Sequence, residues 1–502
     1  MGPERAKNII VFIGDGMGPT TVTAGRIFKG QLSGGAGEDA KLVFEDFPFT
    51  GLAKTYNVDK QVPDSAGTAT AIFSGIKTRY GVIGMDATTT PTDASRGRLE
   101  TILDWAVAAG KRTGIVTTTR ITHATPAALY AKIHHRDWEC ETEVPLGSRG
   151  IFKDIARQLI EDEPGSRLNV ILGGGLSPMG ATNFAEMKTT QFEGDTENVC
   201  IREDGRNLTS DWLKSKPSEG GARYIRTRDE LLRVNTSGTD YLLGLFRNNH
   251  LTYAIAAEPE EPSLAEMVQQ AIRVLTRKNS NGFFLMVEGG RIDQAHHQNY
   301  AHAALREVVE FDAAVDVALT LTDSAETLVI VTADHSHAMT LNGYPLRGED
   351  ILGFANKTGT EPPYETLTYA NGPGFWGHRT NDSQKIHGTW VRVDEIGAEK
   401  RSAPTYRHLA TLPLKDETHG GEDVAVYATG PGASLIRGTF DQNYLAYAMS
   451  FVGCLGPVDY LNKKCSERSS APAVAASAPS GAPFSALLAA LITSGVVHFL
   501  IK

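Results

Sequence analysis

Cysteine is rare in this sequence. Only 4 of its 502 residues are cysteines, and none lies in the CxxC spacing of a zinc ribbon. So few cysteines also exclude a small disulfide scaffold, so a large buried core must stabilise the fold. Cys454 and Cys465 are close enough in the sequence to staple a terminal loop, which leaves Cys140 and Cys200 as the other pair to consider.

An excess of basic residues is also lacking. The chain has 49 Lys and Arg residues against 59 Asp and Glu residues, which gives a formal net charge of −10. This balance argues against a nucleic-acid surface, so we expect no nucleic-acid partner, although bound divalent cations would offset part of the negative charge. A chain of 502 residues is long enough for one large α/β domain or for two ordinary domains.

The N-terminus lacks the hydrophobic segment of a signal peptide, and we interpret it as incomplete. At the other end, residues 466–483 form a Ser/Ala/Pro-rich spacer, and residues 484–502 form an apolar tail. This order is typical of a GPI-attachment signal, and a tail-anchored transmembrane helix is the alternative. We therefore expect the protein on the extracellular face of the cell membrane, with the lipid attached at one of four small residues: Ser469, Ser470, Ala471 or Ala473.

Four N-x-S/T sequons occur in the chain, at Asn207, Asn235, Asn356 and Asn381. Glycosylation of these asparagines would fit the secretory route that a GPI signal requires. Sequons also occur by chance, so they support this route only together with the tail.

Short apolar runs alternate with helical patterns along the chain. The runs predict strands that are buried on both faces, at residues 8–13, 114–117, 168–172, 283–287, 328–331 and 424–427. The patterns between them predict helices at residues 99–109, 151–160, 263–276 and 301–322. This alternation predicts an α/β three-layer sandwich, in which helices flank a large, mostly parallel central sheet.

Two segments interrupt the alternation. Residues 343–408 are rich in Gly, Pro, Asn and Tyr, and they show short extended runs but no convincing helix. We interpret them as a small β-rich insertion over one end of the sheet. Residues 200–234 are polar and have no clear pattern.

Residues 62–71 contain a proline, an acid, a serine and a run of small residues. Ser65 in this segment would lie where a loop enters a helix, beside free backbone N–H groups that stabilise a developing anion. The alternative is an ordinary helix cap, formed by Asp64 or Ser65. Acids and histidines elsewhere in the chain favour the first interpretation.

Several of these acids and histidines follow predicted strands. The carboxyl ends of parallel strands form the ligand-binding edge of such a sheet. The residues at these ends are Asp15, Glu288, Asp334 and His335. A shared site explains their positions better than four independent helix caps.

Asp293 and His297 are four residues apart, so they project from one face of a helix. With a distant histidine such as His419, they supply the three protein ligands of a zinc ion with an open position. An ion pair on a helix surface is the alternative for Asp293 and His297 alone.

A second group has the ligands for further cations. Asp334 and His335 need one more carboxylate for a second zinc ion, and Asp15 supplies it. Glu288 is a hard oxygen ligand that suits magnesium better. The alternative for Asp334 is a helix N-cap.

Six ordered motifs resemble those of the animal-type alkaline phosphatases, and the resemblance extends from about residue 7 to residue 454. The motifs are Phe12-Ile-Gly-Asp-Gly-Met17, Pro63-Asp-Ser-Ala-Gly-Thr-Ala-Thr70, Thr117-Thr-Thr-Arg120, Val287-Glu-Gly-Gly-Arg-Ile-Asp293, Val331-Thr-Ala-Asp-His-Ser-His337 and Thr418-His-Gly-Gly-Glu-Asp423. The resemblance implies a catalytic domain over residues 7–465, with residues 343–408 as its crown-like insertion. It also implies a phosphate monoesterase that forms a phosphoserine at a site with two zinc ions and one magnesium ion.

The resemblance also implies a role for each site residue. The first zinc ion would be bound by Asp293, His297 and His419, and the second by Asp15, Asp334 and His335, with the nucleophile Ser65 beside it. Magnesium would be bound by Asp15, Thr125 and Glu288, with His123 next to this group. Thr125 stands where many members have serine, and either hydroxyl can be a ligand. Arg136 matches the arginine that clamps the phosphate, and Asp64 would orient it.

Two departures from the family pattern affect the expected partners. Vertebrate relatives carry a further calcium site, with an acidic residue after Gly-Leu-Phe, whereas Arg247 stands at that position here. This substitution counts against the calcium ion. The long N-terminal helix that embraces the other subunit is absent from this sequence, and a homodimer is still expected.

Two other kinds of function fit part of the pattern. A sulfatase of the same superfamily needs a C-x-P-S-R motif, which the chain lacks, and phosphodiesterases usually have threonine at the position of Ser65 and lack the Arg136 clamp. A non-enzymatic surface glycoprotein with this fold should have lost at least one metal ligand, and none is missing. The natural substrate cannot be inferred, because the chemistry recognises the phosphoryl group while the leaving group faces solvent.

Overall fold

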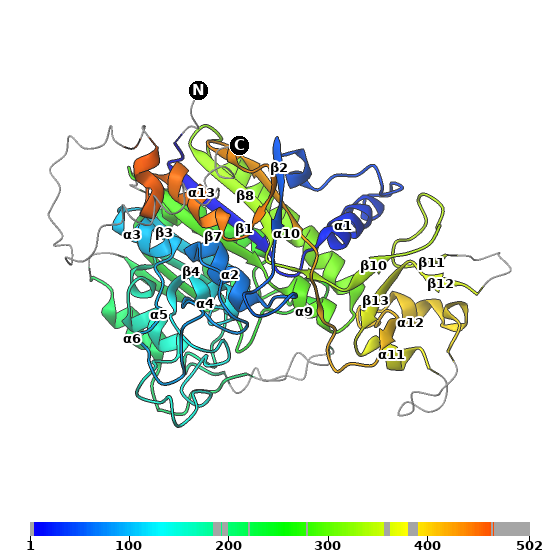
Figure 1. Cartoon of the computed structure of the whole chain (residues 1–502), viewed down its shortest axis with the longest axis horizontal. Coiled ribbons are helices and arrows are strands. Elements are labelled where there is room, and N and C mark those ends of the chain that lie inside the picture. Colours follow the sequence, from blue (N-terminus) through cyan, green and yellow to red (C-terminus); the bar gives the residue numbers. More distant parts are fainter. Residues whose placement is uncertain are drawn as a thin grey trace. The chain divides into compact units, whose positions relative to one another are not determined.

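The computed structural model of the chain is built on a ten-stranded, mostly parallel sheet (Figure 1). The strand order is β17-β2-β16-β8-β1-β7-β3-β4-β6-β5, and β16 is antiparallel to both of its neighbours. The strands are β1 (Asn8–Gly14), β2 (Phe49–Lys54), β3 (Arg112–Arg120), β4 (Val170–Gly174), β5 (Ala222–Ile225), β6 (Tyr241–Leu245), β7 (Phe283–Gly289), β8 (Thr327–Ala333), β16 (Val424–Thr429) and β17 (Gly438–Asp441). This sheet confirms the predicted α/β fold.

The central strands follow the predicted apolar runs. Every residue of β1, β7 and β8 is buried, as expected for parallel strands that are covered on both faces. The register pairs Ile13 of β1 with Glu288 of β7 and with Thr332 of β8. The polar residues that follow these strands therefore emerge together at one edge of the sheet.

Helices flank the sheet in two groups of mutually contacting elements. The first group contains α2 (Ser65–Ser74), α3 (Ile102–Ala108), α4 (Ala124–Tyr130) and α13 (Tyr444–Gly453). The second contains α1 (Pro19–Leu32), α8 (Leu264–Thr276), α9 (Arg291–His297) and α10 (Ala301–Leu321). The segment without a clear sequence pattern forms α6 (Leu208–Ser215), β5 and α7 (Arg228–Leu232).

Two helices begin later than the sequence pattern predicts, because polar residues cap them. The pattern predicts a helix from residue 99, but α3 begins at Ile102, since the backbone N–H of Thr101 donates to Asp104 (2.8 Å) in a capping box. The helix predicted from residue 151 is α5 (Ile155–Glu161), which begins after Asp154 accepts a hydrogen bond from the N–H of Arg157 (2.9 Å).

The predicted insertion is rich in short strands. Its main sheet joins β10 (Met339–Leu341), β13 (Leu367–Asn371) and β14 (Ala410–Leu412), and a smaller sheet pairs β11 (Phe354–Ala355) with β12 (Tyr364–Glu365). The strands β10 and β14 lie just outside residues 343–408. The expectation of no helix was wrong, because α11 (Gly374–Gly377) and α12 (Ala398–Ser402) form there. Both helices are too short to produce a helical period in the sequence.

The insertion leaves and rejoins the main fold at one place. The two-residue strand β9 (Ser336–His337) pairs antiparallel with β15 (His419–Gly420), so His337 lies opposite His419. This short ladder joins the two ends of the insertion next to the predicted metal ligands.

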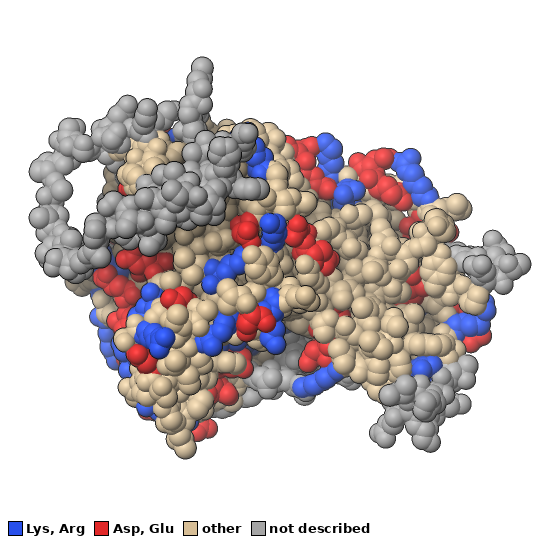
Figure 2. All heavy atoms as spheres, viewed as in Figure 1, with Lys and Arg blue, Asp and Glu red and all other residues tan. Residues whose placement is uncertain are grey.

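The structure describes residues 5–183, 192, 199–218, 221–277, 280–355, 362–379, 390–462 and 465. The spacer, the apolar tail, the predicted lipid-attachment residues, Asn356 and Asn381 lie outside these residues. Within the described part, no helix is both long enough and apolar enough to cross a membrane. Figure 2 shows acidic and basic side chains interspersed over the described surface of one face.

Candidate active site

Ser65 is the first residue of α2, directly after the cap residue Asp64. The side chain of Asp64 accepts a hydrogen bond from the N–H of Gly67 (3.2 Å), so the ordinary capping interpretation holds for this residue. The hydroxyl of Ser65 is buried, and its Oγ lies 3.3 Å from Asp15 Oδ1 and 3.1 Å from His335 Nε2. The segment therefore both caps the helix and places a serine among polar groups.

The carboxylate of Asp64 also holds Arg136. Its Oδ2 atom accepts hydrogen bonds from Arg136 Nη1 (3.1 Å) and from the N–H of Gly81 (3.1 Å), while Oδ1 accepts one from Asn57 Nδ2 (3.0 Å). Asp64 is fully buried, whereas 20% of the Arg136 side chain is exposed. The guanidinium group is thus held at Asp64, the residue that precedes Ser65, and remains partly exposed.

Asp293, His297 and His419 come together although more than 120 residues separate the last two. His419 Nε2 lies 3.1 Å from His297 Nε2 and 3.4 Å from Asp293 Oδ1. The Nδ1 atom of His419 faces the carbonyl oxygen of Pro63 (2.7 Å), and that of His297 faces the carbonyl oxygen of Glu417. These backbone partners orient both rings so that their Nε2 atoms point to a common centre.

Sequence reasoning did not identify His337, which joins the same group of possible ligands. Its Nε2 atom lies 2.6 Å from Asp293 Oδ1, and its Nδ1 atom is hydrogen-bonded to the buried carboxylate of Glu417. Burial disfavours the charge on His337, but Glu417 and Asp293 outweigh burial and raise its pKa to about 10. His337 therefore orients Asp293. The alternation of His335 and His337 along an extended segment was the available signal.

Asp15, Asp334 and His335 form the second group, at the ends of β1 and β8. His335 Nε2 lies 3.1 Å from Asp334 Oδ2 and 3.5 Å from Asp15 Oδ1, and all three side chains are completely buried. Asp334 Oδ1 accepts a hydrogen bond from the N–H of Gly16 (3.0 Å). Gly16 has φ +70°, and a Cβ atom there would lie 2.4 Å from the ring of His337, so only glycine fits.

Asp15 also belongs to a third group, with His123 and Glu288. Glu288 Oε2 accepts hydrogen bonds from Thr117 and from Thr119 (3.0 Å). Three buried atoms near this group have no hydrogen-bond partner: Glu288 Oε1, Thr125 Oγ1 and His123 Nδ1. Buried polar atoms without partners are costly, so this group is better suited to a bound ligand than to being empty.

The electrostatics of the second and third groups favour added positive charge. Burial, together with Asp334, Asp293 and Glu288, raises the pKa of Asp15 well above its ordinary value. Burial raises the pKa of Glu288 to about 7. Burial also lowers the pKa of His335 and of His123 well below the ordinary value, so both rings are neutral and able to bind a metal ion. Divalent cations would relieve the repulsion among the buried carboxylates.

The family model for alkaline phosphatase matches residues 6–455. The chain belongs to the alkaline phosphatase family. It is 61% identical over 471 residues to "Alkaline phosphatase 4" of Drosophila melanogaster, and the aligned region covers 92% of this chain and 79% of the relative. It is 42% identical over 500 residues to the "Membrane-bound alkaline phosphatase" of Bombyx mori, and the aligned region covers 97% of this chain and 86% of the relative.

A solved bacterial structure has the same fold. It is a mutant of TAB5 alkaline phosphatase "with Mg bound in the M3 site", with a TM-score of 0.61 and 22% identity over 91% of this chain and 100% of the other. The identity to the animal enzymes and the family match make this alkaline phosphatase a phosphate monoester hydrolase that binds metal ions.

Other predicted residues of this alkaline phosphatase lie away from the three groups. Asn207 caps α6, and Asn235 precedes a short 3₁₀ helix. Cys140 is bonded to Cys200, and Cys454 and Cys465 are both disulfide-bonded. Arg247, the residue after Gly-Leu-Phe that counts against a calcium ion, donates from Nε to Glu261 Oε1 (2.6 Å).

Proposed function

We propose that this alkaline phosphatase hydrolyses phosphate monoesters through a phosphoserine formed on Ser65. The observation that carries the proposal is the position of the Ser65 hydroxyl. It lies at the first residue of α2, between the carboxylate of Asp15 and the ring of His335, with the guanidinium group of Arg136 held beside it by Asp64. Backbone N–H groups at a helix N-terminus favour the negative charge of a phosphoryl group.

The residues present fit two zinc ions and one magnesium ion. The proposed ligands are Asp293, His297 and His419 for one zinc ion, Asp15, Asp334 and His335 for the other, and Asp15, Thr125 and Glu288 for magnesium, with His123 beside them. The partnerless oxygens of Thr125 and Glu288 and the converging Nε2 atoms of His297 and His419 support this assignment. Bound divalent cations stabilise the negative charge on the attacking and leaving oxygens in an in-line displacement.

Arg136 binds the phosphoryl group in this proposal. Its planar guanidinium group can donate two parallel N–H bonds to two non-bridging oxygens. Asp64 holds one end of the guanidinium group, and this fixes the plane in which the phosphate is received. The phosphorus atom is thereby aligned with Ser65 Oγ.

Two displacements complete the reaction. Ser65 Oγ loses its proton and forms a bond to phosphorus while the bond to the ester oxygen breaks, and the leaving alkoxide gains a proton to become the alcohol. A water molecule then attacks the phosphorus from the opposite side, the bond to Oγ breaks, and Ser65 regains its proton as inorganic phosphate is released. Arg136 and the N–H groups of α2 stabilise the phosphoryl charge in both steps.

A trapping experiment tests this proposal. The enzyme is mixed with a phosphate monoester, quenched in acid during turnover and digested for mass spectrometry. We expect a phosphate group on the peptide that contains Ser65. Turnover without this phosphopeptide, or with the phosphate on another residue, would refute the covalent route. Comparison of kcat/KM for a monoester and for a diester separates this activity from that of a phosphodiesterase.

We further propose that the mature enzyme is a glycosylated homodimer, held on the extracellular face of the cell membrane by a GPI anchor. The small residues from Ser469 to Ala473, the spacer and the apolar tail support the anchor, and the name of the Bombyx mori relative agrees with a membrane location.

Expression behind a signal peptide allows treatment of the cell surface with a phosphatidylinositol-specific phospholipase C. Release of activity into the medium is expected, and retention together with peptides from residue 484 onward would instead show a tail-anchored helix. Light scattering of the released enzyme tests the homodimer.

A further inference from the structure

A buried ion pair lies behind the proposed phosphate clamp. Arg120 donates from Nε to Glu139 Oε2 (2.8 Å) and from Nη2 to Glu139 Oε1 (2.6 Å), so the pair is bidentate. Only 7% of Arg120 and 6% of Glu139 are exposed. Bidentate pairs of this kind fix the orientation of both side chains.

This ion pair joins two segments that carry site residues. Arg120 is the last residue of β3, and His123 and Thr125 lie in the next five residues of the chain. Glu139 lies three residues after Arg136. The hydroxyl of Thr122 also donates to Glu139, which adds a second link between the same two segments.

The two segments meet again at the site itself. His123 Nε2 lies 3.3 Å from Arg136 Nη2, on the opposite side of the guanidinium group from Asp64. The guanidinium group of Arg136 therefore contacts Asp64 through Nη1 and His123 through Nη2. The links that Glu139 makes to Arg120 and Thr122 therefore join the same two segments that meet at His123 and Arg136.

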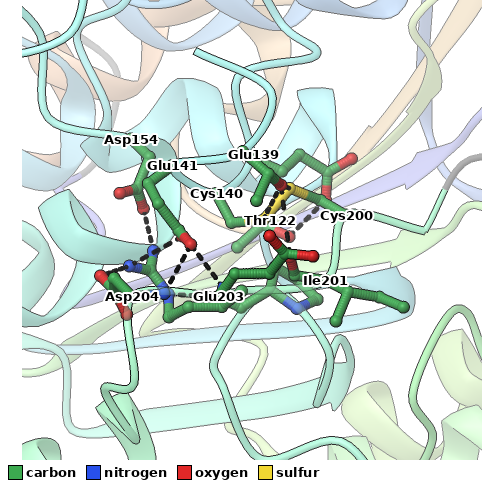
Figure 3. The surroundings of a disulfide bond; sticks show 12 residues. Thr122, Glu139, Cys140, Glu141, Asp154, Cys200, Ile201, Glu203 and Asp204 are labelled. Carbon is green, nitrogen blue, oxygen red and sulfur yellow. Dashed lines mark hydrogen bonds and ion pairs between the residues drawn. A yellow bond between two sulfur atoms is a disulfide. The ribbon is translucent and has the colours of Figure 1, made fainter.

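The far side of Glu139 is anchored to the rest of the fold. The next residue, Cys140, is bonded to Cys200, and Figure 3 shows Glu139, Thr122 and this disulfide side by side. The neighbouring Arg202 has a completely buried side chain that is paired with Asp154. Glu139 is thus a fixed point from which the segment of Arg136 extends toward the site.

We propose that Glu139 is a positioning residue that sets the affinity for phosphate by holding Arg136 in place. The proposal rests on the proposed function, because it takes Arg136 as the phosphate clamp. Without the carboxylate, Arg120 loses its buried acidic partner and keeps Asn249 and His250, while Glu139 no longer links the segment of Arg136 to Arg120 and Thr122 by charge. Arg136 would keep Asp64 as a partner but would no longer be held at the His123 side.

The first test compares Glu139→Gln with Glu139→Asp by inhibition with inorganic phosphate, with metal content measured in parallel. A misplaced clamp should raise the Ki for phosphate about 10-fold to 100-fold in Glu139→Gln without loss of metal. Glu139→Asp keeps the charge and should recover part of the affinity. The control is Asp312→Asn, which removes the pair of Lys29 with Asp312 (2.6 Å) far from the site and should leave Ki unchanged.

A double-mutant cycle with Arg136→Ala separates positioning from general stability. If Glu139 acts through Arg136, then Glu139→Gln should raise Ki much less in the Arg136→Ala background than in the wild type. The proposal would be overturned if Glu139→Gln raised Ki by the same factor in both backgrounds. It would also be overturned if Glu139→Gln lowered the melting temperature but left Ki unchanged. Thr122→Val removes only one link to Glu139 and should raise Ki by a smaller factor, so it provides the same test if Glu139→Gln does not fold.

The wild-type enzyme distinguishes this inference from the proposed function. If phosphate did not compete with a monoester in the wild type, or if Arg136→Ala left Ki unchanged, the clamp itself would be wrong. If both measurements gave the expected result while Glu139→Gln behaved like the wild type, only the role of Glu139 would be refuted.

Discussion

Ser65 Oγ lies 3.1 Å from His335 Nε2, although 270 residues separate these two side chains in the sequence. One begins α2, and the other follows the end of β8. The hydroxyl is therefore held between a helix N-terminus and a strand end, which leaves it little freedom to turn away from Asp15. A serine that only capped a helix would need neither neighbour.

Replacing Ser65 with alanine should abolish the phosphoserine and lower kcat by about a thousandfold or more, because the nucleophile is lost. Zinc content should stay the same, since Asp15, Asp334 and His335 are unchanged. The matched control is Ser74→Ala at the other end of α2, where the hydroxyl donates to Thr70 O (2.6 Å), and this variant should keep its activity. Wild-type turnover in Ser65→Ala would contradict the covalent mechanism.

Replacing Arg136 with alanine should weaken transition-state stabilisation by about 2–4 kcal/mol, the scale for one preorganised donor. Phosphate inhibition and kcat/KM measure this loss. Zinc content should not change, because no proposed ligand contacts Arg136 except through Asp64 and His123. Arg233→Ala, which removes an arginine side chain that is 80% exposed, serves as the control. Zinc loss in Arg136→Ala would show that Arg136 supports the metal site instead.

Replacing His337 with glutamine should lower the affinity for zinc at Asp293 by about 10-fold to 100-fold, because residues that orient a metal ligand have effects of this size. Competition with a chelator measures the affinity. His302→Gln on α10 removes a histidine outside the three groups and should bind zinc like the wild type. Unchanged zinc affinity in His337→Gln would mean that Asp293 needs no such partner.

Chelation should remove the activity and lower the melting temperature, since it leaves the buried carboxylates of Asp15 and Glu288 without compensating charge. Elemental analysis of the untreated enzyme should give two zinc ions and one magnesium ion per chain. Zinc and magnesium together should restore the activity, whereas magnesium alone should not. Full activity without zinc would contradict the proposed ligand assignment.

Glu307 on α10 gives a pH-dependent contribution to stability that does not involve the metal site. Burial raises its pKa from the ordinary 4.5 to about 7, and Oε1 accepts a hydrogen bond from the N–H of Ala254 (2.6 Å). A raised carboxyl pKa means that the folded state binds the proton more tightly than the unfolded state. Ionisation of Glu307 therefore does not lower the free energy of unfolding below pH 4.5, and above pH 7 it lowers this free energy by about 3 kcal/mol.

Glu307→Gln removes this cost and keeps an acceptor for Ala254. Its melting temperature relative to the wild type should therefore increase as the pH rises from 4.5 to 7, and should then level off. Thermal unfolding at several pH values measures the difference. Glu310→Gln on the same helix, whose carboxylate pairs with Arg306 (3.0 Å), is the control. A constant difference between Glu307→Gln and wild type would contradict the raised pKa.

The central sheet could be predicted from the sequence because its strands are buried on both faces. Continuous apolar runs mark β1, β7 and β8, and the residues after them had to meet at one edge. The strand β2 and its neighbour, the edge strand β17, were not predicted. Both are short and partly exposed: β2 buries only two of its residues, and no residue of β17 is fully buried. Their pairing depends on tertiary contacts that no local pattern reports.

In the site, too, the residues that follow a local sequence pattern could be predicted, and those that depend on tertiary contacts could not. Asp293 and His297 could be grouped because a helix fixes their spacing, and Asp15 and Asp334 because strand ends converge. His337 and Glu139 were not identified, because their interactions depend on partners that only the fold brings close, Glu417 and Asp293 for His337 and Arg120 for Glu139. For His337 the alternation with His335 was a weak signal, whereas nothing in the sequence marked Glu139.

The ladder between β9 and β15 joins the two ends of the crown-like insertion, and the insertion also packs on α1 and α10 through Ile351, Phe375 and Ala410. His337 and His419 stand opposite each other across this ladder, so backbone hydrogen bonds fix the relative position of two histidines of the proposed zinc site, one before the chain enters the insertion and one after it returns. Those parts of the insertion that contact neither α1, α10 nor the ladder can change their length and surface without moving these histidines. The enzyme can therefore acquire a new surface beside its active site in evolution while the metal ligands stay in register.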